Sequence, residues 1–409
     1  MTYEYTKNTL KNGLEVIIEP RPERKVTGIE MMVKTGSNYQ NENNRGIIHL
    51  LEHLLGNGSE NYPGRSEAEE EIAKRGGILS MCSSVTNVTI EGIVNSKDQE
   101  ELIKSIIDIG FRSKLNYLEE EKKIIESEIS EYKDDEEIIS LENLDKIMYE
   151  NDYLLDVTGK IKPVNSFEIE QIKEVYEDLF HPNNTSIAIV GPVEEEKILS
   201  KIEDLTNDFE RKNQPKREKL KPTNKFEEKI EKKDCVSTYL QIGIHLPKLD
   251  FNSGSYWNFQ MINKILGSSS DLNLLLEKLR KENNLVYYIK SFLQNYRDAY
   301  SMGIETNFSP KNQKEVEKSI KKVIDSFPKN ITEKKLRDIK KYYRGYEKIS
   351  RDKVNFEASK LNKYNLYNNL DYLDKRMDII ENLKLEEIKR TSEKYLNSNK
   401  LYKSIVKPK

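Results

Sequence analysis

Apolar positions along this 409-residue chain follow two spacings that alternate from one end to the other. Runs such as LEVIIEP at 14–20 and TSIAIVG at 185–191 are typical of β-strands. Runs such as SIIDIGFRSKL at 105–115 and VEKSIKKVIDSF at 316–327 repeat apolar residues every three to four positions, which indicates amphipathic helices. Strand-like and helical runs mixed in this way predict an α+β fold.

The chain also repeats itself. KDQEELIKSI at 97–106 recurs as KNQKEVEKSI at 311–320, an offset of 214 residues, and both copies follow a strand-like run. LLGNGS at 54–59 recurs as ILGSSS at 265–270, an offset of 211 residues. Because the two matches occur in the same order at nearly the same offset, we interpret the chain as two duplicated α+β domains of about 200 residues each.

A charged stretch marks the boundary between the halves. Residues 208–233 contain prolines and almost no apolar residues, and they precede the strand-like run CVSTYLQIGIHL at 235–246. We therefore predict an N-terminal domain at 1–207, a linker at 208–233 and a C-terminal domain at 234–409.

Composition narrows the class of protein. The formal net charge of −3 gives no sign of a nucleic-acid partner or an anionic membrane. No run approaches the roughly 18 apolar residues of a membrane span, and the first residues lack the apolar core of a secretory signal. The two cysteines, Cys82 and Cys235, could form at most one disulfide, so we expect a reduced, cytoplasmic protein.

Two of the four histidines lie within five positions, in the segment HLLEH that begins at His49. On a helix, His49 and His53 differ in direction by about 40°, so both imidazoles can reach one ion. Glu52 lies on the adjacent side of that helix. This H-x-x-E-H arrangement suits two imidazole ligands on Zn²⁺ with a carboxylate general base beside them, as in inverzincin peptidases.

The alternative is that these histidines only support the structure. The flanking residues are apolar nearly all round the helix, so two histidines and a glutamate there would be costly to bury without partners. A metal ion would provide them. In the second half, the positions of His49, Glu52 and His53 hold Gln260, Asn263 and Lys264. We therefore expect the fold not to require these ligands, and the second half to bind no metal here.

A catalytic zinc needs about three protein ligands. The helical segment NYLEEEKKIIESEISEY at 116–132 places Leu118, Glu121, Ile125 and Glu128 on one stripe. Either glutamate could supply the third ligand, or both could belong to the acidic face of an ordinary amphipathic helix. Spacing alone leaves these alternatives open.

HLLEH followed by EKKIIESE resembles the inverzincin metallopeptidase family of pitrilysin, insulin-degrading enzyme and mitochondrial processing peptidase. LKNGLEVII at 10–18 and HPNNTSIAIVGPV at 181–193 are similar to other segments of that family. The resemblance implies one zinc ion per chain, bound by His49, His53 and Glu128. It also implies that Glu52 is the general base and that Glu121 assists catalysis.

In the second half, LRKENNLVYY at 279–288 is similar to the family segment in which an Arg and a Tyr orient the substrate peptide. Arg280 and Tyr287 take those positions. Two departures stand out. Ser80, Met81 and Cys82 replace the usual residues of an edge strand that pairs with substrate in the family, so we expect a different specificity. Asn284 replaces a glycine, and because Asn tolerates a positive φ we expect the turn to survive.

The resemblance implies a zinc endopeptidase that cleaves peptides or unfolded segments inside an enclosed chamber. With two domains per chain, we expect a homodimer, or a heterodimer with a related chain. The alternative is a non-catalytic or accessory subunit of a processing-peptidase-like complex. That role fits less well because this chain holds both the H-x-x-E-H motif and the Arg/Tyr pair. A zinc ion with a purely structural role would need a fourth ligand, for which we find no candidate.

Overall fold

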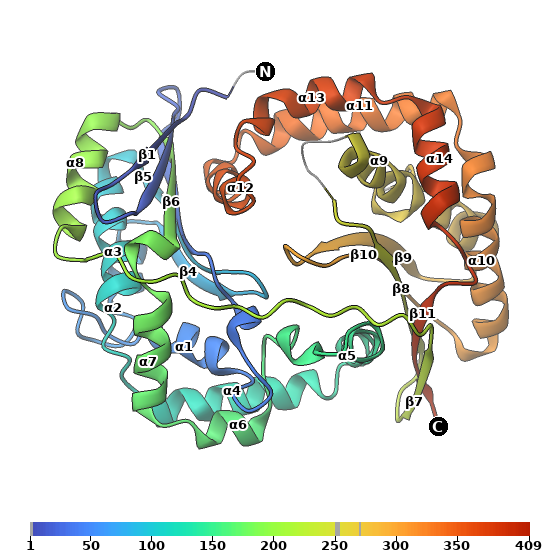
Figure 1. The fold of residues 1–409 in the computed structure, drawn as a ribbon, viewed down its shortest axis with the longest axis horizontal. Coiled ribbons are helices and arrows are strands. Elements are labelled where there is room, and N and C mark those ends of the chain that lie inside the picture. Colours follow the sequence, from blue (N-terminus) through green and yellow to red (C-terminus); the bar gives the residue numbers. More distant parts are fainter. Residues whose placement is uncertain (1–2, 250–253, 270) are drawn as a thin grey trace. The chain divides into compact units, whose positions relative to one another are not determined.

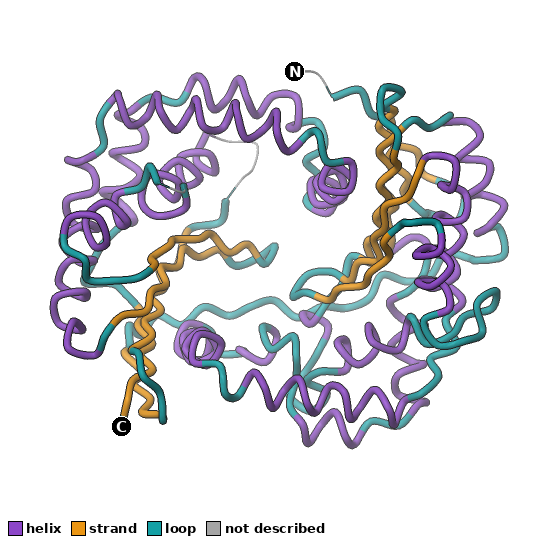
Figure 2. Tube along the Cα trace, turned by 180° about the vertical axis from the view of Figure 1, so that it is seen from behind, coloured by secondary structure: helices purple, strands orange, loops and turns teal. Residues whose placement is uncertain are grey.

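The computed structural model describes residues 3–249, 254–269 and 271–409. The chain forms two compact units, each built from three segments of the sequence. The first unit comprises Met1–Ile129, Tyr153–Glu218 and Lys348–Asp374, and the second comprises Ser130–Asp152, Lys219–Glu347 and Lys375–Lys409. Helices flank a β-sheet in each unit (Figure 1, Figure 2). No helix among the described residues is both long and apolar enough to cross a membrane.

The first unit is built on a six-stranded sheet in the order β1-β2-β6-β3-β5-β4. Its strands are β1 Thr6–Thr9, β2 Glu15–Pro20, β3 Val26–Val33, β4 Ile78–Ser83, β5 Val88–Asn95 and β6 Thr185–Gly191. β2 and β6 run parallel, whereas the other neighbours are antiparallel. β4 is one of the two edge strands, so one side of its backbone has no partner within this sheet.

Helices cover both faces of this sheet. They are α1 Ile47–Leu55, α2 Glu67–Lys74, α3 Gln99–Arg112, α4 Leu118–Tyr132, α6 Ile161–Ser166, α7 Ile169–Leu179, α8 Glu195–Thr206 and α12 Val354–Leu366. Short 3₁₀ turns are η1 Ser37–Tyr39, η2 Ser96–Asp98, η3 Asp152–Leu154 and η4 Pro182–Asn184. α3 and α8 lie on one face and α12 on the other (Figure 1). Alternate strand residues therefore enter two different apolar clusters.

α12 comes from the second half of the sequence but packs on the sheet of the first unit. Its Val354, Ala358 and Leu361 are buried against Ile17 and other residues of that sheet. The Asn362 amide nitrogen donates to the backbone oxygen of Glu30 at 2.8 Å and to its side chain at 3.1 Å. These contacts make the exchanged helix part of the first unit's core.

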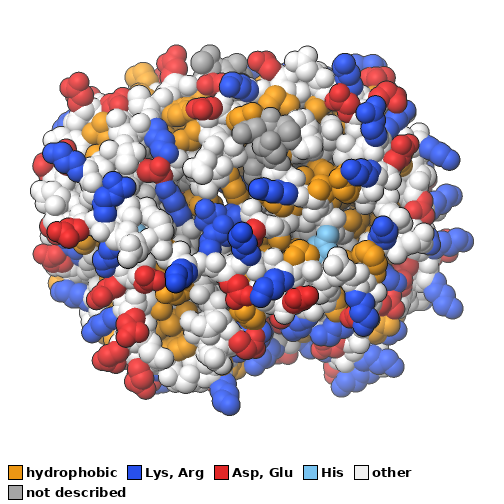
Figure 3. All heavy atoms as spheres, in the orientation of Figure 1, with side chains coloured by type: hydrophobic (Ala, Val, Ile, Leu, Met, Phe, Trp, Pro, Cys, Tyr) orange, Lys and Arg blue, Asp and Glu red, His pale blue; other side chains and the backbone are white. Residues whose placement is uncertain are grey.

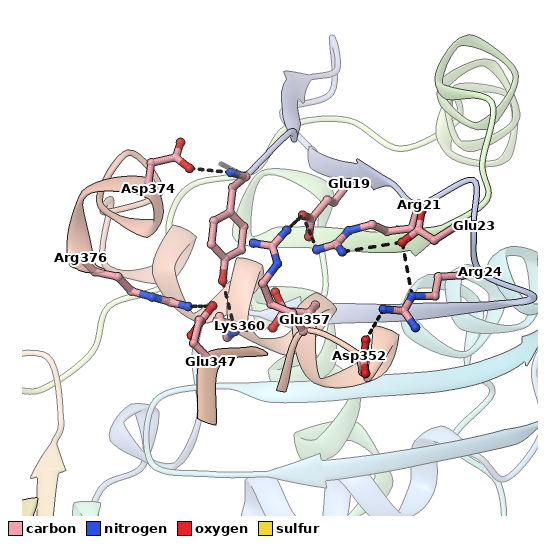
Figure 4. A network of polar contacts seen from close by, with 12 residues as sticks. Glu19, Arg21, Glu23, Arg24, Glu347, Asp352, Glu357, Lys360, Asp374 and Arg376 are labelled. Carbon is pink, nitrogen blue, oxygen red and sulfur yellow. Dashed lines mark hydrogen bonds and ion pairs between the residues drawn. The ribbon is translucent and has the colours of Figure 1, made fainter. Parts of the chain in front are cut away.

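A polar network fixes the segment before α12 (Figure 4). Glu19 on β2 accepts hydrogen bonds from Arg21 at 2.8 Å and from Arg351 at 2.7 Å. The Arg351 guanidinium also lies 3.8 Å from the ring centroid of Tyr3, which is a cation–π contact. The backbone nitrogen of Tyr3 in turn donates to Asp374. Both ends of the exchanged segment are therefore tied to the N-terminal part of the chain, through Glu19 on β2 and Tyr3 before β1.

The second unit has a five-stranded sheet in the order β7-β11-β8-β10-β9. Its strands are β7 Glu228–Lys233, β8 Thr238–Leu246, β9 Tyr288–Asn295, β10 Tyr300–Phe308 and β11 Tyr402–Pro408. Its helices are α5 Glu136–Met148, α9 Gly254–Asn263, α10 Gln313–Asn330, α11 Glu333–Ser350, α13 Tyr372–Asn382 and α14 Leu385–Tyr395, with π-helical segments η5 Lys264–Ser268 and η6 Leu276–Glu282 and the 3₁₀ turn η7 Pro310–Asn312. α5, from the first half of the sequence, packs on β8 and β11.

The two sheets repeat one topology. β2, β6, β3, β5 and β4 of the first sheet follow the same order as β7, β11, β8, β10 and β9 of the second. The single parallel pair also recurs, as β2 with β6 and as β7 with β11. The predicted α+β class and the predicted duplication are confirmed. The exchange follows the duplication too, because α12 covers β3 and β6 of the first sheet and α5 covers β8 and β11, the matching strands of the second.

The compact units differ from the contiguous domains predicted at 1–207 and 234–409, because 130–152 and 348–374 are exchanged. Within the predicted linker at 208–233, Glu228–Lys233 form β7, which pairs in parallel with β11. The last six residues of the predicted linker therefore form a strand. Their charged side chains are typical of an edge strand, where lysines discourage further pairing.

Charged side chains of both signs are spread over the face of the molecule seen in Figure 3. This agrees with the nearly balanced totals of 67 Lys and Arg against 70 Asp and Glu.

Glu30 makes the packing of α12 depend on pH. Burial raises the pKa of Glu30 to about 7, so between about pH 4.5 and 7 the folded protein holds a proton that the unfolded chain has released. The free energy of unfolding therefore falls as the pH rises through this window. We expect Glu30→Gln to raise the free energy of unfolding at pH 8 by up to about 3 kcal/mol, and to change it little at pH 5, measured by urea denaturation.

Glu15 on β2 provides a control of opposite sign. Burial alone would raise its pKa, but hydrogen bonds from Lys34 and Lys7 outweigh burial and lower the pKa to about 2. Glu15→Gln should therefore lower the free energy of unfolding at pH 8. If Glu30→Gln also lowered the free energy of unfolding at pH 8, this account of Glu30 would be wrong.

Candidate metal centre

α1 carries the H-x-x-E-H motif through the interior of the first unit. Its apolar residues Ile48, Leu50, Leu51, Leu54 and Leu55 are fully buried. Gly46 precedes the helix with a φ of 90°, a conformation that favours glycine. The backbone nitrogen of Gly46 donates to the Gln40 side chain at 2.8 Å, which fixes the start of the helix. A helix buried on most sides in this way holds its polar side chains in fixed positions.

α4 presents Glu121 and Glu128 on the same side as the buried Ile125. The chain enters α4 through Leu115 and Tyr117, which have positive φ values of 53° and 66° although neither is a glycine. Such conformations are costly and persist only where surrounding contacts impose them. The entry to α4 is therefore under local strain immediately before Glu121.

The imidazoles of α1 meet a single carboxylate oxygen of α4. Nε2 of His49 and Nε2 of His53 each lie 3.6 Å from Oε2 of Glu128. The two imidazole rings are 4.7 Å apart at an angle of 88°. Within the described ranges, these three residues form the one group of histidine, cysteine or carboxylate side chains whose ligand atoms all lie within 4.8 Å of one another.

This group fits a zinc ion. Two ligand atoms about 2.1 Å from one tetrahedral zinc lie about 3.4 Å apart, close to both nitrogen–oxygen separations. Nitrogen and carboxylate oxygen are ligands that zinc accepts, and three protein ligands leave a position for substrate. The predicted ligands His49, His53 and Glu128 are therefore brought together in an arrangement suited to a catalytic metal.

The other nitrogen of each imidazole has a partner outside the group. Nδ1 of His49 lies 3.4 Å from the backbone oxygen of Thr158, and Nδ1 of His53 lies 3.2 Å from Oε2 of Glu121. Such partners hold Nδ1 as the donor and leave Nε2 free to bind a metal. Glu121 thus contacts His53, one of the predicted ligands, rather than belonging to the group of three.

The electrostatic surroundings agree with a cation. Burial, reinforced by the nearby His53, lowers the pKa of His49 to about 4, so His49 is neutral at pH 7 as a ligand must be. Burial also acts to lower the pKa of His53, but the hydrogen bond with Glu121 and the charges of Glu52 and Glu128 outweigh it and raise the pKa. The negative charge that would retain a proton on His53 would equally attract a divalent metal.

Glu52 lies beside this group without belonging to it. Its Oε2 accepts a hydrogen bond from Oγ of Ser83, at the end of the edge strand β4, at 3.3 Å. Burial raises the pKa of Glu52, partly offset by the charge of His53. A carboxylate with a raised pKa exchanges protons more readily near neutral pH, as a general base requires.

Arg280 and Tyr287 lie together in the second unit. Arg280 is on η6, and its guanidinium carbon is 5.4 Å from the ring centroid of Tyr287. Tyr287 is 78% exposed, although a tyrosine would ordinarily bury part of its ring. Asn284 between them has a φ of 51°, so the prediction that Asn would preserve this turn is confirmed. Ser80, Met81 and Cys82 lie on the edge strand β4, and both cysteines are free.

The second unit shows what replaces the ligands. Gln260 and Asn263 lie on α9, and Lys264 begins η5. The Lys264 ammonium lies 5.5 Å from the ring centroid of Tyr342 on α11. With the offset of 214 residues found in the sequence, Tyr342 corresponds to Glu128. A cation–π contact therefore links the two helices at the positions where the first unit has its histidine–carboxylate group.

Sequence reasoning missed several contacts of the centre: Asn57, Arg65, Ser83 and the backbone of Thr158. The Asn57 amide donates to Oε1 of Glu121 at 2.9 Å, and Arg65 donates to the same oxygen. Helical spacing could have suggested Asn57, which lies four positions after His53. Arg65, Ser83 and a backbone oxygen leave no comparable signal, because only the tertiary fold brings them near.

The amino-acid sequence matches two models of one protein family. Residues 15–158 match the model for "Insulinase (Peptidase family M16)", and residues 166–343 match "Peptidase M16 inactive domain". The chain therefore belongs to peptidase family M16. The second description agrees with the absence of the motif histidines from the corresponding positions Gln260 and Lys264.

Individual relatives agree with this assignment. The uncharacterized zinc protease YmxG of Bacillus subtilis is 23% identical over 362 residues, covering 88% of this chain and 87% of its own length. The mitochondrial-processing peptidase subunit beta of Dictyostelium discoideum is 25% identical over 199 residues, 48% of this chain and 42% of its own. A crystal structure of a protease from Helicobacter pylori superimposes with a TM-score of 0.92 at 18% identity over 99% of both chains, which shows a common fold.

We predict that the purified protein carries about one zinc ion per chain, measured by elemental analysis. His49→Ala, His53→Ala and Glu128→Gln should each lower the zinc content sharply, because each removes one of three ligands. Glu121→Gln should reduce it less, because this residue contacts a ligand from outside. Zinc that is retained by Glu128→Gln but lost by Glu121→Gln would reverse the assignment of the two glutamates.

Proposed function

We propose that this chain is a zinc-dependent endopeptidase in which His49, His53 and Glu128 bind the metal. The observation that carries the proposal is the convergence of two imidazole nitrogens on one carboxylate oxygen, with the buried Glu52 on the same helix. Relatives named as zinc proteases support it. A structural zinc site would be closed by a fourth ligand, and the group offers three.

Bound zinc would supply a Lewis acid that lowers the pKa of water and polarises a peptide carbonyl. Glu52 acts as the general base: its carboxylate takes a proton from the attacking water, and the oxygen of that water bonds to the carbonyl carbon. When the carbon–nitrogen bond breaks, Glu52 returns the proton to the leaving amine. The hydrogen bond from Ser83 holds one oxygen of Glu52 in place.

We further propose that Glu121 acts with the catalytic group, as the family resemblance implies, and that Arg280 and Tyr287 bind the substrate peptide. The exposure of Tyr287 supports a binding role, because its ring is available to a partner. The resemblance also implies an enclosed chamber, which admits peptides and unfolded segments rather than folded proteins. We infer that the protein acts in the cytoplasm, where free thiols such as Cys82 and Cys235 persist.

The functional unit that we propose is a homodimer, in which the first unit of one chain works with the second unit of another. A heterodimer with a related chain is the other possibility, since the mitochondrial-processing relative is by name a subunit. The rival function is an accessory subunit without catalysis. The chain's possession of both Glu52 and the Arg280/Tyr287 pair favours the catalytic role.

Glu52→Gln should bind zinc and peptide normally but cleave about 10²- to 10⁴-fold more slowly, because the amide cannot take a proton. The measurement is turnover of a mixed peptide library, read by mass spectrometry, with zinc content determined on the same sample. Ser83→Ala provides a milder comparison, because it removes only a hydrogen bond to Glu52. Near-normal turnover by Glu52→Gln would exclude this residue as the base.

Mixing two impaired variants tests the dimer. In a hybrid of Glu52→Gln and Arg280→Ala, one site carries both defects and the other carries neither. With equal amounts and random exchange, half of the dimers are hybrids, so activity should return to roughly a quarter of wild type. Native mass spectrometry confirms that subunits exchange. If activity does not recover despite exchange, each site lies within one chain or Arg280 does not serve it.

A further inference from the structure

Glu121 is held on both of its carboxylate oxygens. Oε2 faces Nδ1 of His53 at 3.2 Å, while Oε1 accepts from the Asn57 amide at 2.9 Å and from the Arg65 guanidinium. The side chain is only 4% exposed, so water contributes little to these contacts. Asn57 and Arg65 therefore determine where the oxygen that faces His53 can lie.

Asn57 connects the two helices of the centre directly. Its amide nitrogen donates both to Oε1 of Glu121 on α4 and to the backbone oxygen of His53, at 3.0 Å, on α1. Asn57 is 4% exposed and lies just beyond the end of α1. The Asn57 amide thus binds the backbone of His53, and it also binds the carboxylate of Glu121, which faces the His53 imidazole.

Arg65 comes from the loop between α1 and α2 and contacts the start of α4 and the residue before it. Its guanidinium carbon lies 5.7 Å from the ring centroid of Tyr117, the residue with positive φ just before α4. It also donates to Glu121 one turn further on. Arg65 therefore supports the strained entry to α4 and the carboxylate that follows it.

We propose that Asn57 and Arg65 are positioning residues of the metal centre, acting through Glu121 on His53. They hold Glu121 so that it accepts the Nδ1 proton of His53, which directs Nε2 toward the metal and Glu128. Hydrogen-bonded partners of this kind typically contribute 10- to 100-fold to metal affinity. The inference rests on the metal centre of the proposed function, and it assigns both residues to affinity for zinc rather than to the chemical step.

Whether Arg65→Gln weakens or strengthens zinc binding distinguishes a positioning role from simple charge repulsion. A positive charge near a divalent cation repels it, so by Coulomb's law alone Arg65→Gln would strengthen zinc binding. If Arg65 instead positions Glu121, the same substitution weakens zinc binding. A role only in folding would lower the melting temperature and leave the affinity of the folded protein unchanged.

The experiment measures zinc dissociation constants by competition with a chromophoric chelator, well below the melting temperature of each variant. Asn57→Leu and Arg65→Gln should each bind zinc about 10- to 100-fold more weakly than wild type. Arg65 is 43% exposed at its side chain, so Arg65→Gln should fold even if Asn57→Leu does not. Unchanged or tighter zinc binding by folded Arg65→Gln would overturn the proposal.

Asn184→Leu is the matched control. Asn184 is 2% exposed, and its amide donates to the backbone oxygen of Leu179 at the end of α7, much as Asn57 does at the end of α1. It should lower the melting temperature and leave zinc affinity within about threefold, because it contacts no residue of the metal centre. A loss of affinity equal to that of Asn57→Leu would mean that any loss of a buried amide weakens the site, and would overturn the assignment.

Repeating Arg65→Gln in a Glu121→Gln background tests the route of the effect. If Arg65 acts through the carboxylate, the second substitution should cause little further loss, whereas independent effects would add. Fully additive losses would therefore overturn the role through Glu121. A wild-type protein that fails to bind zinc would instead contradict the proposed function, and the two failures are distinguishable.

Discussion

The approach of two imidazoles to one carboxylate oxygen is the interaction on which the first unit's centre depends. It requires α1 and α4 to lie side by side, each at a fixed rotation about its own axis. Inserting or deleting one residue in either helix would turn the side chains that follow by about 100°. The apolar residues of α1 fix its rotation, because they are buried in the core on the sides of the helix that do not face α4. Packing in the core therefore fixes the relative positions of the three side chains that we propose as ligands.

Much of this arrangement could be predicted from the sequence, and the reasons differ by residue. His49, Glu52 and His53 lie on one helix, where spacing alone determines which side chains share a face. The spacing within α4 could not choose between Glu121 and Glu128, and only the family resemblance separated them. The contacts of Asn57, Arg65 and Thr158 depend on how loops return to the centre, which local patterns do not encode.

The exchange of α5 and α12 was beyond prediction for a related reason. An amphipathic pattern shows that one face of a helix will be buried, but not which sheet will bury it. β7 was missed because its residues EKIEKK are mostly charged, and a strand at a sheet edge needs little apolar surface. The duplicated topology, by contrast, was visible because both halves keep the same order of strand-like and helical runs.

The exchange has a consequence for synthesis on the ribosome. The first unit lacks its last helix until residues 354–366 have been made, long after its sheet is complete at Gly191. At about 5–20 residues per second, that interval lasts roughly 8–35 s. During this time Ile17, Ala188 and Val190 have no helix to cover them, so the nascent chain presents an apolar sheet face. The native first unit thus cannot form before most of the second half has been translated.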